Sequence, residues 1–264
     1  MSEPRASLFA RATRNLREYR RLTKGTTASL LPQQDYGVYV LNLERSPERR
    51  RYISAHLPSV GLTPTILNAV DGKKLDYTAL VAAGRYSDQA CFDAFSRKLL
   101  PAEVGCSLSH VSAYEALLAS NHSFALVVED DAQFSADARM RIDQLLKEAP
   151  RDWGIVQLRF DSREFERQSE HLVRFTFGTD WPVSATAYLI SRSAASTLLG
   201  IVYPIRYPAD SLLGRANTWN IAVFGAWPEV VGVNNVFPSA IQGNRNWRFR
   251  LSNLAKWLIL RVFG

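Results

Sequence analysis

The sequence predicts an α/β domain with a mostly parallel central sheet flanked by helices. Three short apolar runs, 36–43, 63–70 and 124–128, have the length and composition of strands that are buried on both faces. A helix-forming segment separates the first two runs, which gives the strand–helix–strand order of parallel sheets. At 264 residues, the chain is long enough for one large α/β domain or two small ones.

The first predicted strand, 36–43, leads into a helix with a clear starting signal. Ser46 is a residue type that caps helix N-termini, and Pro47 suits the first helical position. Three arginines at 49–51 follow in the first turns, where positive charge opposes the helix dipole. A nearby phosphate would offset that cost, and three ordinary surface arginines are the alternative interpretation.

The rest of the chain continues the same alternation. The strand at 63–70 closes in the turn signal Asp71-Gly72, and residues 73–100 have a mixed pattern that predicts no single element. Apolar residues at helical spacing then predict a helix over 103–120. Further patterns predict a helix from 138 to about 150, strands at 153–158, 172–177 and 184–190, a short helix ending near Gly200, and a helix start at Pro208.

Three consecutive acids, Glu129, Asp130 and Asp131, end the strand at 124–128. Open α/β sheets place their ligand sites at the carboxyl ends of strands. Adjacent carboxylates repel one another unless a cation or hydrogen-bond donors hold them, and their oxygens suit Mg²⁺ or Mn²⁺. Along a strand, Glu129 and Asp131 would point the same way and Asp130 the other. The alternative is a solvated turn that precedes a helix.

Other polar side chains are candidates with a structural alternative. Ser107 and His110 lie on the predicted helix just before the acidic strand, although a single helical histidine is more often structural. Asp210 follows Pro208 in a weakly charged neighbourhood and is also placed to cap a helix. The serines at 107 and 109 lack the GxSxG context of a nucleophile elbow, which argues against a serine hydrolase.

The net charge of +7 is concentrated at the two ends of the chain. Residues 1–34 carry seven bases and two acids, residues 244–264 carry five bases and no acid, and the body carries 20 bases and 23 acids. We expect a basic amphipathic arm and linker at 1–34, one domain at 35–246, and a basic amphipathic helix at 247–264. Both ends suit an anionic membrane surface, with a solvated extension as the alternative for the arm. The acidic body argues against nucleic-acid binding.

The cysteines and the apolar runs bear on compartment. Two cysteines, Cys91 and Cys106, are too few for a disulfide framework and fit a reducing compartment. The sequence has no CxxC and no Cys/His cluster with the usual zinc spacing. It also shows no signal-peptide core and no run of about 18 apolar residues. We therefore expect a cytoplasmic protein.

Taken together in their order and spacing, several short motifs resemble those of glycosyltransferase family 25, the lipooligosaccharide-type glycosyltransferases. The matching segments are Val40-Leu-Asn-Leu-Glu-Arg45 with Arg49, Asn68-Ala-Val-Asp-Gly72, Glu103-Val-Gly-Cys-Ser-Leu-Ser-His110, Leu126-Val-Val-Glu-Asp-Asp131, Asp152-Trp-Gly-Ile-Val-Gln-Leu158, Thr186-Ala-Tyr-Leu-Ile-Ser191, Pro208-Ala-Asp210 and Pro238-Ser-Ala-Ile-Gln242. The resemblance implies a GT-A-type nucleotide-binding fold. It also implies inverting transfer of a hexose, commonly galactose, from a UDP-sugar to a lipooligosaccharide or other surface-glycan acceptor.

The resemblance also implies roles for the candidate residues. The acidic strand end becomes the counterpart of an Asp-x-Asp motif, with Asp131 and Glu129 holding Mn²⁺ or Mg²⁺ and Asp130 holding the ribose hydroxyls. Asp210 is the expected base for the acceptor hydroxyl. The remaining donor-site candidates are Val40, Asn42, Arg45 and Asp71 around the uridine, Arg49 at the phosphates, Ser107 and His110 on the nucleotide or sugar side, and Gln242 at the diphosphate or acceptor. A lipid-linked acceptor would place the protein on the inner face of a bacterial inner membrane.

Two other classes use similar residues. A metal-dependent phosphotransferase would need a phosphate-binding glycine loop, and the sequence has no Walker motif. A non-catalytic protein that binds nucleotide sugars or glycans through a decayed site is the stronger alternative. The three intact acids at the strand end argue against it.

Overall fold

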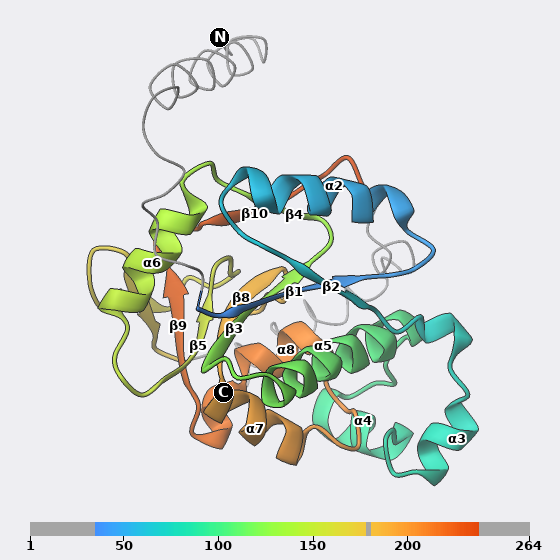
Figure 1. The fold of residues 1–264 in the computed structure, drawn as a ribbon. Coiled ribbons are helices and arrows are strands. Elements are labelled where there is room, and N and C mark those ends of the chain that lie inside the picture. The colour runs from blue at the N-terminus through green and yellow to red at the C-terminus, as the bar shows by residue number, and fades with distance from the viewer. Residues whose placement is uncertain (1–34, 178–180, 238–264) are drawn as a thin grey trace, which may run out of the picture. The chain divides into compact units, whose positions relative to one another are not determined.

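The computed structural model describes residues 35–177 and 181–237 (Figure 1). Its helices are α2 (Pro47–Ser59), α3 (Tyr77–Ala82), α4 (Asp88–Phe95), α5 (Pro101–Ala119), α6 (Ala138–Glu148), α7 (Arg192–Ile201) and α8 (Ala209–Gly214), with 3₁₀ turns η1 (Gly72–Lys74) and η2 (Ala216–Trp219). Its strands are β1 (Gly37–Asn42), β2 (Thr65–Asn68), β3 (Phe124–Glu129), β4 (Ala132–Phe134), β5 (Trp153–Gln157), β6 (Phe165–Arg167), β7 (Leu172–Phe175), β8 (Ala187–Ser191), β9 (Ala222–Ala226) and β10 (Val231–Val233). The predicted arm at 1–34 and helix at 247–264 lie outside the described residues.

Eight strands form the central sheet in the order β2-β1-β3-β8-β5-β9-β7-β6. β1 pairs in parallel with β2 and β3, and β5 pairs in parallel with β9. β8 runs antiparallel to β3 and β5, and β7 runs antiparallel to β9 and β6, so the other six of the eight strands point one way. The predicted α/β class with a mostly parallel sheet is confirmed, and this architecture is the one expected of a GT-A-type domain.

The predicted strand–helix–strand unit is formed by β1, α2 and β2. Pro47 occupies the first turn of α2, as expected, and Ser46 is the N-cap residue, although its side chain makes no capping hydrogen bond. The Ser46 carbonyl instead accepts a hydrogen bond from Asn42 Nδ2 at 3.2 Å. The turn that starts α2 is therefore tied to the end of β1.

The strands divide the core into two layers by strict alternation. On β1, Tyr39 and Leu41 pack in one cluster with α5, whereas Val38 and Val40 pack in the other with α2 and α6. β3 alternates in the same way, and both of its faces are buried. Helices α2 and α6 cover one face of the sheet and α5, α7 and α8 cover the other (Figure 1). Burial on both faces explains why these strands read as continuous apolar runs.

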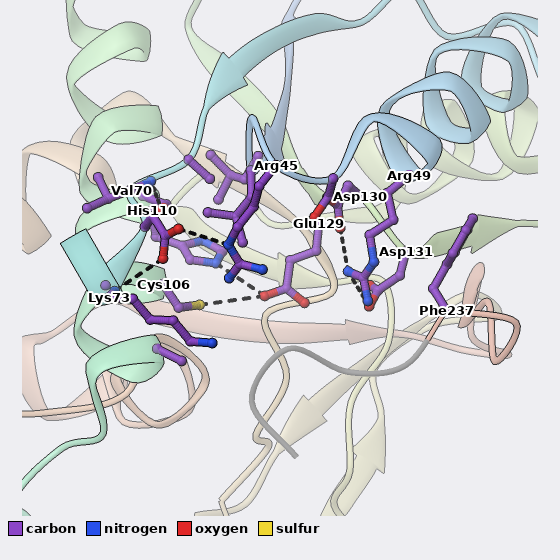
Figure 2. A pocket seen from close by; sticks show the side chains of 18 of the residues that line it. Arg45, Arg49, Val70, Lys73, Cys106, His110, Glu129, Asp130, Asp131 and Phe237 are labelled. Carbon is purple, nitrogen blue, oxygen red and sulfur yellow. Dashed lines mark hydrogen bonds and ion pairs between the residues drawn. The ribbon is translucent and has the colours of Figure 1, made fainter. Parts of the chain in front are cut away.

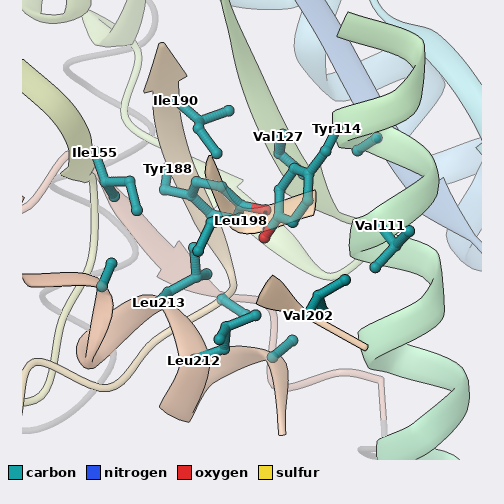
Figure 3. Packing of buried hydrophobic residues seen from close by; sticks show 14 of the residues in the cluster. Val111, Tyr114, Val127, Ile155, Tyr188, Ile190, Leu198, Val202, Leu212 and Leu213 are labelled. Carbon is teal, nitrogen blue, oxygen red and sulfur yellow. Dashed lines mark hydrogen bonds between the residues drawn. The ribbon is translucent and has the colours of Figure 1, made fainter. Parts of the chain in front are cut away.

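The layer beneath α5 is the larger of the two clusters (Figure 3). Tyr114 of α5 and Tyr188 of β8 are both buried there, and the Tyr188 hydroxyl donates to the Tyr114 hydroxyl at 3.2 Å. Leu198 of α7 and Leu212 of α8 complete the contact. This packing fixes α5 against the sheet and so sets the position of the side chains on its other end.

The structure differs from the sequence expectations in three places. The unassigned segment 73–100 contains α3 and α4, each of which begins with a side-chain cap, from Asp76 and Ser87 respectively. Two strands of the central sheet, the buried β9 and the edge strand β6, were not predicted. A separate two-stranded sheet pairs β4 with β10 directly after the acidic segment. None of the helices in the described part of the chain is long and apolar enough to cross a bilayer.

Candidate functional site

A cavity of about 450 Å³ opens at the carboxyl ends of β1, β2 and β3 (Figure 2). The three strands are parallel neighbours, so their ends meet at one edge of the sheet, where α/β folds bind ligands. Seven predicted site residues line this cavity: Arg45, Arg49, Asp71, His110, Glu129, Asp130 and Asp131. They come from four chain segments spread over 87 residues of sequence, and the fold brings them together.

Asp130 is the most enclosed of the three acids. Its Oδ2 accepts a hydrogen bond from Asn42 Nδ2 at 2.7 Å, and its Oδ1 lies 2.6 Å from Arg49 Nη1. Burial raises the pKa of Asp130, and the donors Arg49 and Asn42 act against that shift. Both oxygens are engaged inside the protein, so Asp130 positions Arg49 and the start of α2. Asp130 also lines the cavity, and its contact with the ribose stays a prediction.

Asp131 is an acid of the site whose pKa is clearly shifted by its surroundings. Its Oδ2 lies 3.2 Å from Arg49 Nη1, and Arg49 also lies over the Phe237 ring at 5.6 Å. Burial and the charge of Glu129 raise the pKa of Asp131 to about 6, despite the opposing effect of Arg49. Burial is the largest cause, so the shift reflects mainly the loss of solvent around this carboxylate, with Glu129 adding to it.

Glu129 points toward α5 rather than toward Arg49 (Figure 2). Its Oε1 accepts a hydrogen bond from Cys106 Sγ at 3.7 Å and lies 3.6 Å from His110 Nε2. Burial, Glu129 and Asp210 raise the pKa of the Cys106 thiol well above its usual value. β3 ends at Glu129, and Asp130 and Asp131 form a turn, so strand alternation does not govern where the last two acids point.

Asp71 organises the opposite wall of the cavity. Its Oδ2 accepts from Arg45 Nε at 2.8 Å, and its Oδ1 accepts from the Lys73 backbone, which caps η1. Burial raises the pKa of Asp71, but the hydrogen bonds from Arg45 and Lys73 outweigh it and lower the pKa overall. Arg45 and Lys73 thus bring two positive charges to this wall.

Two glycines allow η1 to lie directly on α5. A Cβ on Gly72 would lie 1.7 Å from the Pro101 carbonyl oxygen, and one on Gly105 would lie 2.5 Å from the Gly72 nitrogen. The backbone of Val70 also donates to Ser109 Oγ at 2.8 Å. This close approach places Asp71 and the α5 side chains on the same cavity.

The other predicted residues that the structure describes lie away from the cavity surface. Val40 is fully buried on the α2 side of the sheet, because strand alternation gives Leu41 the cavity side. Ser107 is buried and donates to the carbonyls of Glu103 and Tyr207, which makes it a structural link to the loop before α8. Asn42 is buried against Asp130. Gln242 lies outside the described residues.

Asp210 lies in the first turn of α8 and is absent from the cavity lining. Its Oδ1 accepts from the backbone of Ser211 at 2.6 Å, but the N-cap position of α8 is Pro208, so Asp210 does not cap the helix as the alternative expected. Its charge nevertheless reaches Cys106, whose pKa it helps to raise. Asp210 therefore lies within electrostatic reach of the cavity from the α8 side.

The sequence interpretation missed two cavity residues whose side chains can bind a ligand or a metal ion, Lys73 and Cys106. Lys73 follows the Asp71-Gly72 turn, and a basic residue beside a turn carries no distinctive signal. Cys106 precedes His110 by four residues on one helix, a spacing that places both on one face. That spacing was available in the sequence, but the third partner, Glu129, becomes apparent only in the fold.

The donor set suits a divalent cation at part of the acidic cluster. Glu129 and Asp131 both line the cavity, and a cation bound there would offset the charge of the Asp131 carboxylate, which burial and Glu129 disfavour. Asp130 fits less well, because its oxygens are held by Asn42 and Arg49. Oxygen ligands of this kind favour hard ions such as Mg²⁺ and Mn²⁺.

Comparison with known proteins gives a consistent match. The family model described as Glycosyltransferase family 25 (LPS biosynthesis protein) matches residues 36–213. A "Glycosyltransferase 25 family member" of Aedes aegypti is 31% identical over 179 residues, which cover 64% of this chain and 29% of that protein. "Procollagen galactosyltransferase 1" of Danio rerio is 28% identical over 182 residues, with 65% and 30% covered.

A third relative has a different description. "Probable inactive glycosyltransferase 25 family member 3" of Bos taurus is 29% identical over 244 residues, which cover 83% of this chain and 39% of that protein. The chain thus spans well under half the length of these curated relatives.

Proposed function

The chain belongs to glycosyltransferase family 25, and from this premise we propose a metal-assisted, inverting transfer of a hexose from a UDP-sugar to a glycan acceptor. Galactose is the favoured hexose, and a lipooligosaccharide or other surface glycan is the favoured acceptor. The family description and the galactosyltransferase name of the Danio rerio relative support these two choices.

One observation carries the proposal. The cavity brings the carboxylates Glu129 and Asp131 together with the cationic side chains Arg45, Arg49 and Lys73 (Figure 2). Cationic side chains bind a diphosphate, and crowded carboxylates bind a divalent cation. A UDP-sugar with its metal ion presents both complementary groups, which explains why charges of opposite sign share one small cavity.

On the donor side, Arg49 is the residue whose partners would change. It now contacts Asp130 and Asp131, and a diphosphate in the cavity would compete for its guanidinium. Arg45 and Lys73, held beside Asp71, face the same cavity from the other wall. We propose that these three cations hold the diphosphate while Leu41 and Val70, on the cavity wall, border the nucleoside.

The metal ion has a defined place in this scheme. Glu129 and Asp131 would hold Mn²⁺ or Mg²⁺. When bound, such an ion offsets the negative charge that develops on the leaving diphosphate. The raised pKa of Asp131 gives the reason that its carboxylate favours a cation over solvent.

Inversion requires a base on the opposite face of the sugar ring, and we propose Asp210 for this role. Its position on α8, with a charge that acts on Cys106, supports an acceptor site on that side of the cavity. Its carboxylate would take the proton of the acceptor hydroxyl as that oxygen attacks the anomeric carbon.

The alternative is a non-catalytic protein that binds nucleotide sugars or glycans. It is favoured by the Bos taurus relative described as inactive. The presence of Glu129, Asp131 and three cations on one cavity supports catalysis instead. Release of UDP from a UDP-sugar distinguishes the transferase from the binding protein, because a binding protein releases no UDP.

The decisive test is a panel of UDP-sugars incubated with the purified chain and Mn²⁺, with released UDP measured. We expect UDP release with at least one hexose donor, loss of release when EDTA is added, and loss in Asp131→Ala. Asp137→Asn, a change at an exposed acid outside the cavity, is the matched control and should behave as the wild type does. Calorimetric UDP affinity that is unchanged in Asp131→Ala would remove the metal assignment.

We also propose that the basic ends, 1–34 and 247–264, hold the protein on the inner face of the bacterial inner membrane. Each basic residue near an anionic surface contributes about 1 kcal/mol. A chain without residues 1–30 and 249–264 should no longer sediment with anionic liposomes, whereas the full chain should. Co-sedimentation of the shortened chain would contradict this localisation.

A further inference from the structure

Three side chains with different donor atoms converge at the inner end of the cavity. Cys106 and His110 are one turn apart on the same face of α5, and Glu129 ends the neighbouring strand β3 (Figure 2). Glu129 Oε1 lies 3.7 Å from Cys106 Sγ and 3.6 Å from His110 Nε2. All three donor atoms lie within 4.8 Å of one another.

His110 gives an independent indication of a ligand. The side chain is 1% exposed, and within the described part of the chain its Nε2 has no hydrogen-bond partner. Its Nδ1 lies 2.8 Å from the Tyr188 hydroxyl, which donates its own proton to Tyr114. With Nδ1 held by the Tyr188 hydroxyl, Nε2 is the ring nitrogen that faces the Glu129 carboxylate.

This arrangement places Nε2 of the buried His110 opposite the Glu129 carboxylate, whose side chain is 30% exposed. A histidine whose second ring nitrogen is held by a fixed partner is typical of metal-ligating histidines, because that partner sets the tautomer. The Tyr188 and Tyr114 hydroxyls supply such a partner for His110. A metal ion between Nε2 and Glu129 Oε1 would give Nε2 the partner that it lacks among the described residues.

Two of the three donor-atom separations are close to those of a tetrahedral site. Metal–sulfur and metal–nitrogen or metal–oxygen distances at zinc place neighbouring ligand atoms about 3.3–3.6 Å apart. The two separations from Glu129 Oε1 are close to this range. The third pair of donor atoms, on Cys106 and His110, lies within 4.8 Å, and metal binding would bring it into the same range. Three protein ligands leave a fourth position, which is the pattern of zinc sites that take an exogenous ligand.

We propose that Cys106, His110 and Glu129 form a binding site for a zinc-class divalent transition-metal ion. Thiolate and imidazole donors favour Zn²⁺ or Co²⁺ over Mg²⁺ or Ca²⁺, which distinguishes this site from the oxygen ligands Glu129 and Asp131. On binding, the Cys106 thiol gives its proton to solvent and sulfur bonds the ion. The site does not rest on the proposed function, because it requires no sugar donor.

Cobalt titration of the full chain tests the site. Co²⁺ bound to a thiolate gives a charge-transfer absorption that oxygen and nitrogen ligands do not give. We expect this band in the wild type, its loss in Cys106→Ser, and its retention in Cys91→Ser. Cys91 is the matched control, because it is fully buried on α4 and does not line the cavity. Its thiol donates a hydrogen bond to the Ile205 carbonyl.

Competition of Zn²⁺ with bound Co²⁺ measures how much His110 and Glu129 contribute to metal affinity. Zn²⁺ affinity should fall at least about tenfold in His110→Gln and in Glu129→Gln, the minimum effect of removing even a supporting partner at metal sites. A wild-type chain that shows no thiolate band, or a band that persists in Cys106→Ser, would overturn the proposal.

A measurement on the unchanged chain covers the case in which a variant fails to fold. Zn²⁺ should abolish alkylation of Cys106, detected by mass spectrometry, with the alkylation of Cys91 in unfolded protein as the internal reference. Undiminished alkylation at saturating Zn²⁺ would contradict the site. UDP release in the absence of a thiolate band would refute only this inference, whereas a thiolate band without UDP release or UDP binding would refute only the proposed function.

Discussion

Arg49 and Asp130 form an ion pair at the base of the cavity, with Nη1 2.6 Å from Oδ1 and side chains 14% and 9% exposed. The second oxygen of Asp130 is bound by Asn42. A carboxylate enclosed in this way needs its hydrogen-bond donors to stay ionised, because burial alone raises its pKa. Arg49 therefore has two roles: it compensates Asp130 and faces the donor cavity.

Arg49→Gln should lower the free energy of unfolding by about 3 kcal/mol, because it leaves a buried carboxylate without its cation. It should also weaken UDP binding, which calorimetry would measure. Arg50→Gln is the matched control, since Arg50 is exposed on the same helix and should change neither quantity by more than about 0.5 kcal/mol.

The two roles of Arg49 can be separated with Asp130→Asn. In the double variant, stability should recover relative to Arg49→Gln alone, because the uncompensated charge is gone. UDP binding should stay weak, since the cation is still missing. Recovery of both quantities together would show that Arg49 acts only through Asp130.

Asp131 should make stability fall as pH rises through the acidic range. Its pKa is raised from the ordinary value to about 6 in the folded protein, so its contribution is fully present below about pH 4 and is lost as pH passes 6. The shift of about two units corresponds to about 3 kcal/mol. Asp131→Asn should remove this part of the pH dependence in metal-free denaturant titrations between pH 4 and 7.

A divalent cation gives the matching control. Mn²⁺ should stabilise the wild type at pH 7, where Asp131 is ionised, and should have a smaller effect on Asp131→Asn. A wild-type stability that rises from pH 4 to 7 in step with that of Asp131→Asn would contradict the charge argument for this residue.

Much of the site could be predicted from the sequence because three parallel strands carry it. The apolar runs of β1 and β3 identify buried strands, and parallel strands bring Arg45, Asp71 and Glu129 to one edge of the sheet. Local pattern therefore predicts which segments meet. It also places β8 as a strand, but no local feature shows that β8 enters the sheet antiparallel between β3 and β5.

The individual contacts could not be predicted, because they join residues far apart in sequence. Asp130 is paired with Arg49, 81 residues away, and Asn42, 88 residues away, so its burial depends on how α2 starts against β3. Cys106 and Glu129 meet only because α5 packs closely on the sheet. Val40 was assigned to the site from its motif, whereas strand alternation gives it to the core.

The approach of η1 to α5 predicts a sharp effect at Gly72. A Cβ there would lie 1.7 Å from the Pro101 carbonyl oxygen, which is backbone and cannot move aside locally. Gly72→Ala should therefore destabilise the chain by about 1–3 kcal/mol or more and weaken UDP binding, because the Asp71 wall must shift.

Gly200→Ala is the matched control, because no atom lies within 4 Å of the added Cβ and the position is exposed on α7. The Gly200→Ala chain should be as stable as the wild type or up to about 1 kcal/mol more stable. Equal thermal melts for the two variants would contradict the packing argument.

Asp210→Asn should separate binding from transfer. Asp210 does not line the cavity, so donor affinity and Mn²⁺ dependence should stay within about twofold of wild type, a difference of about 0.4 kcal/mol. Transfer to an acceptor should fall by about 100-fold or more, because a positioned base contributes 10²–10⁴-fold. Asp152→Asn, at an exposed acid on the turn before β5, should leave transfer unchanged.

The pH profile of kcat/KM decides whether Asp210 is a base or a structural residue. If Asp210 is the base, the acidic limb of the wild-type profile should disappear in Asp210→Asn. A variant that keeps the wild-type limb with lower activity throughout would show that Asp210 only supports the start of α8.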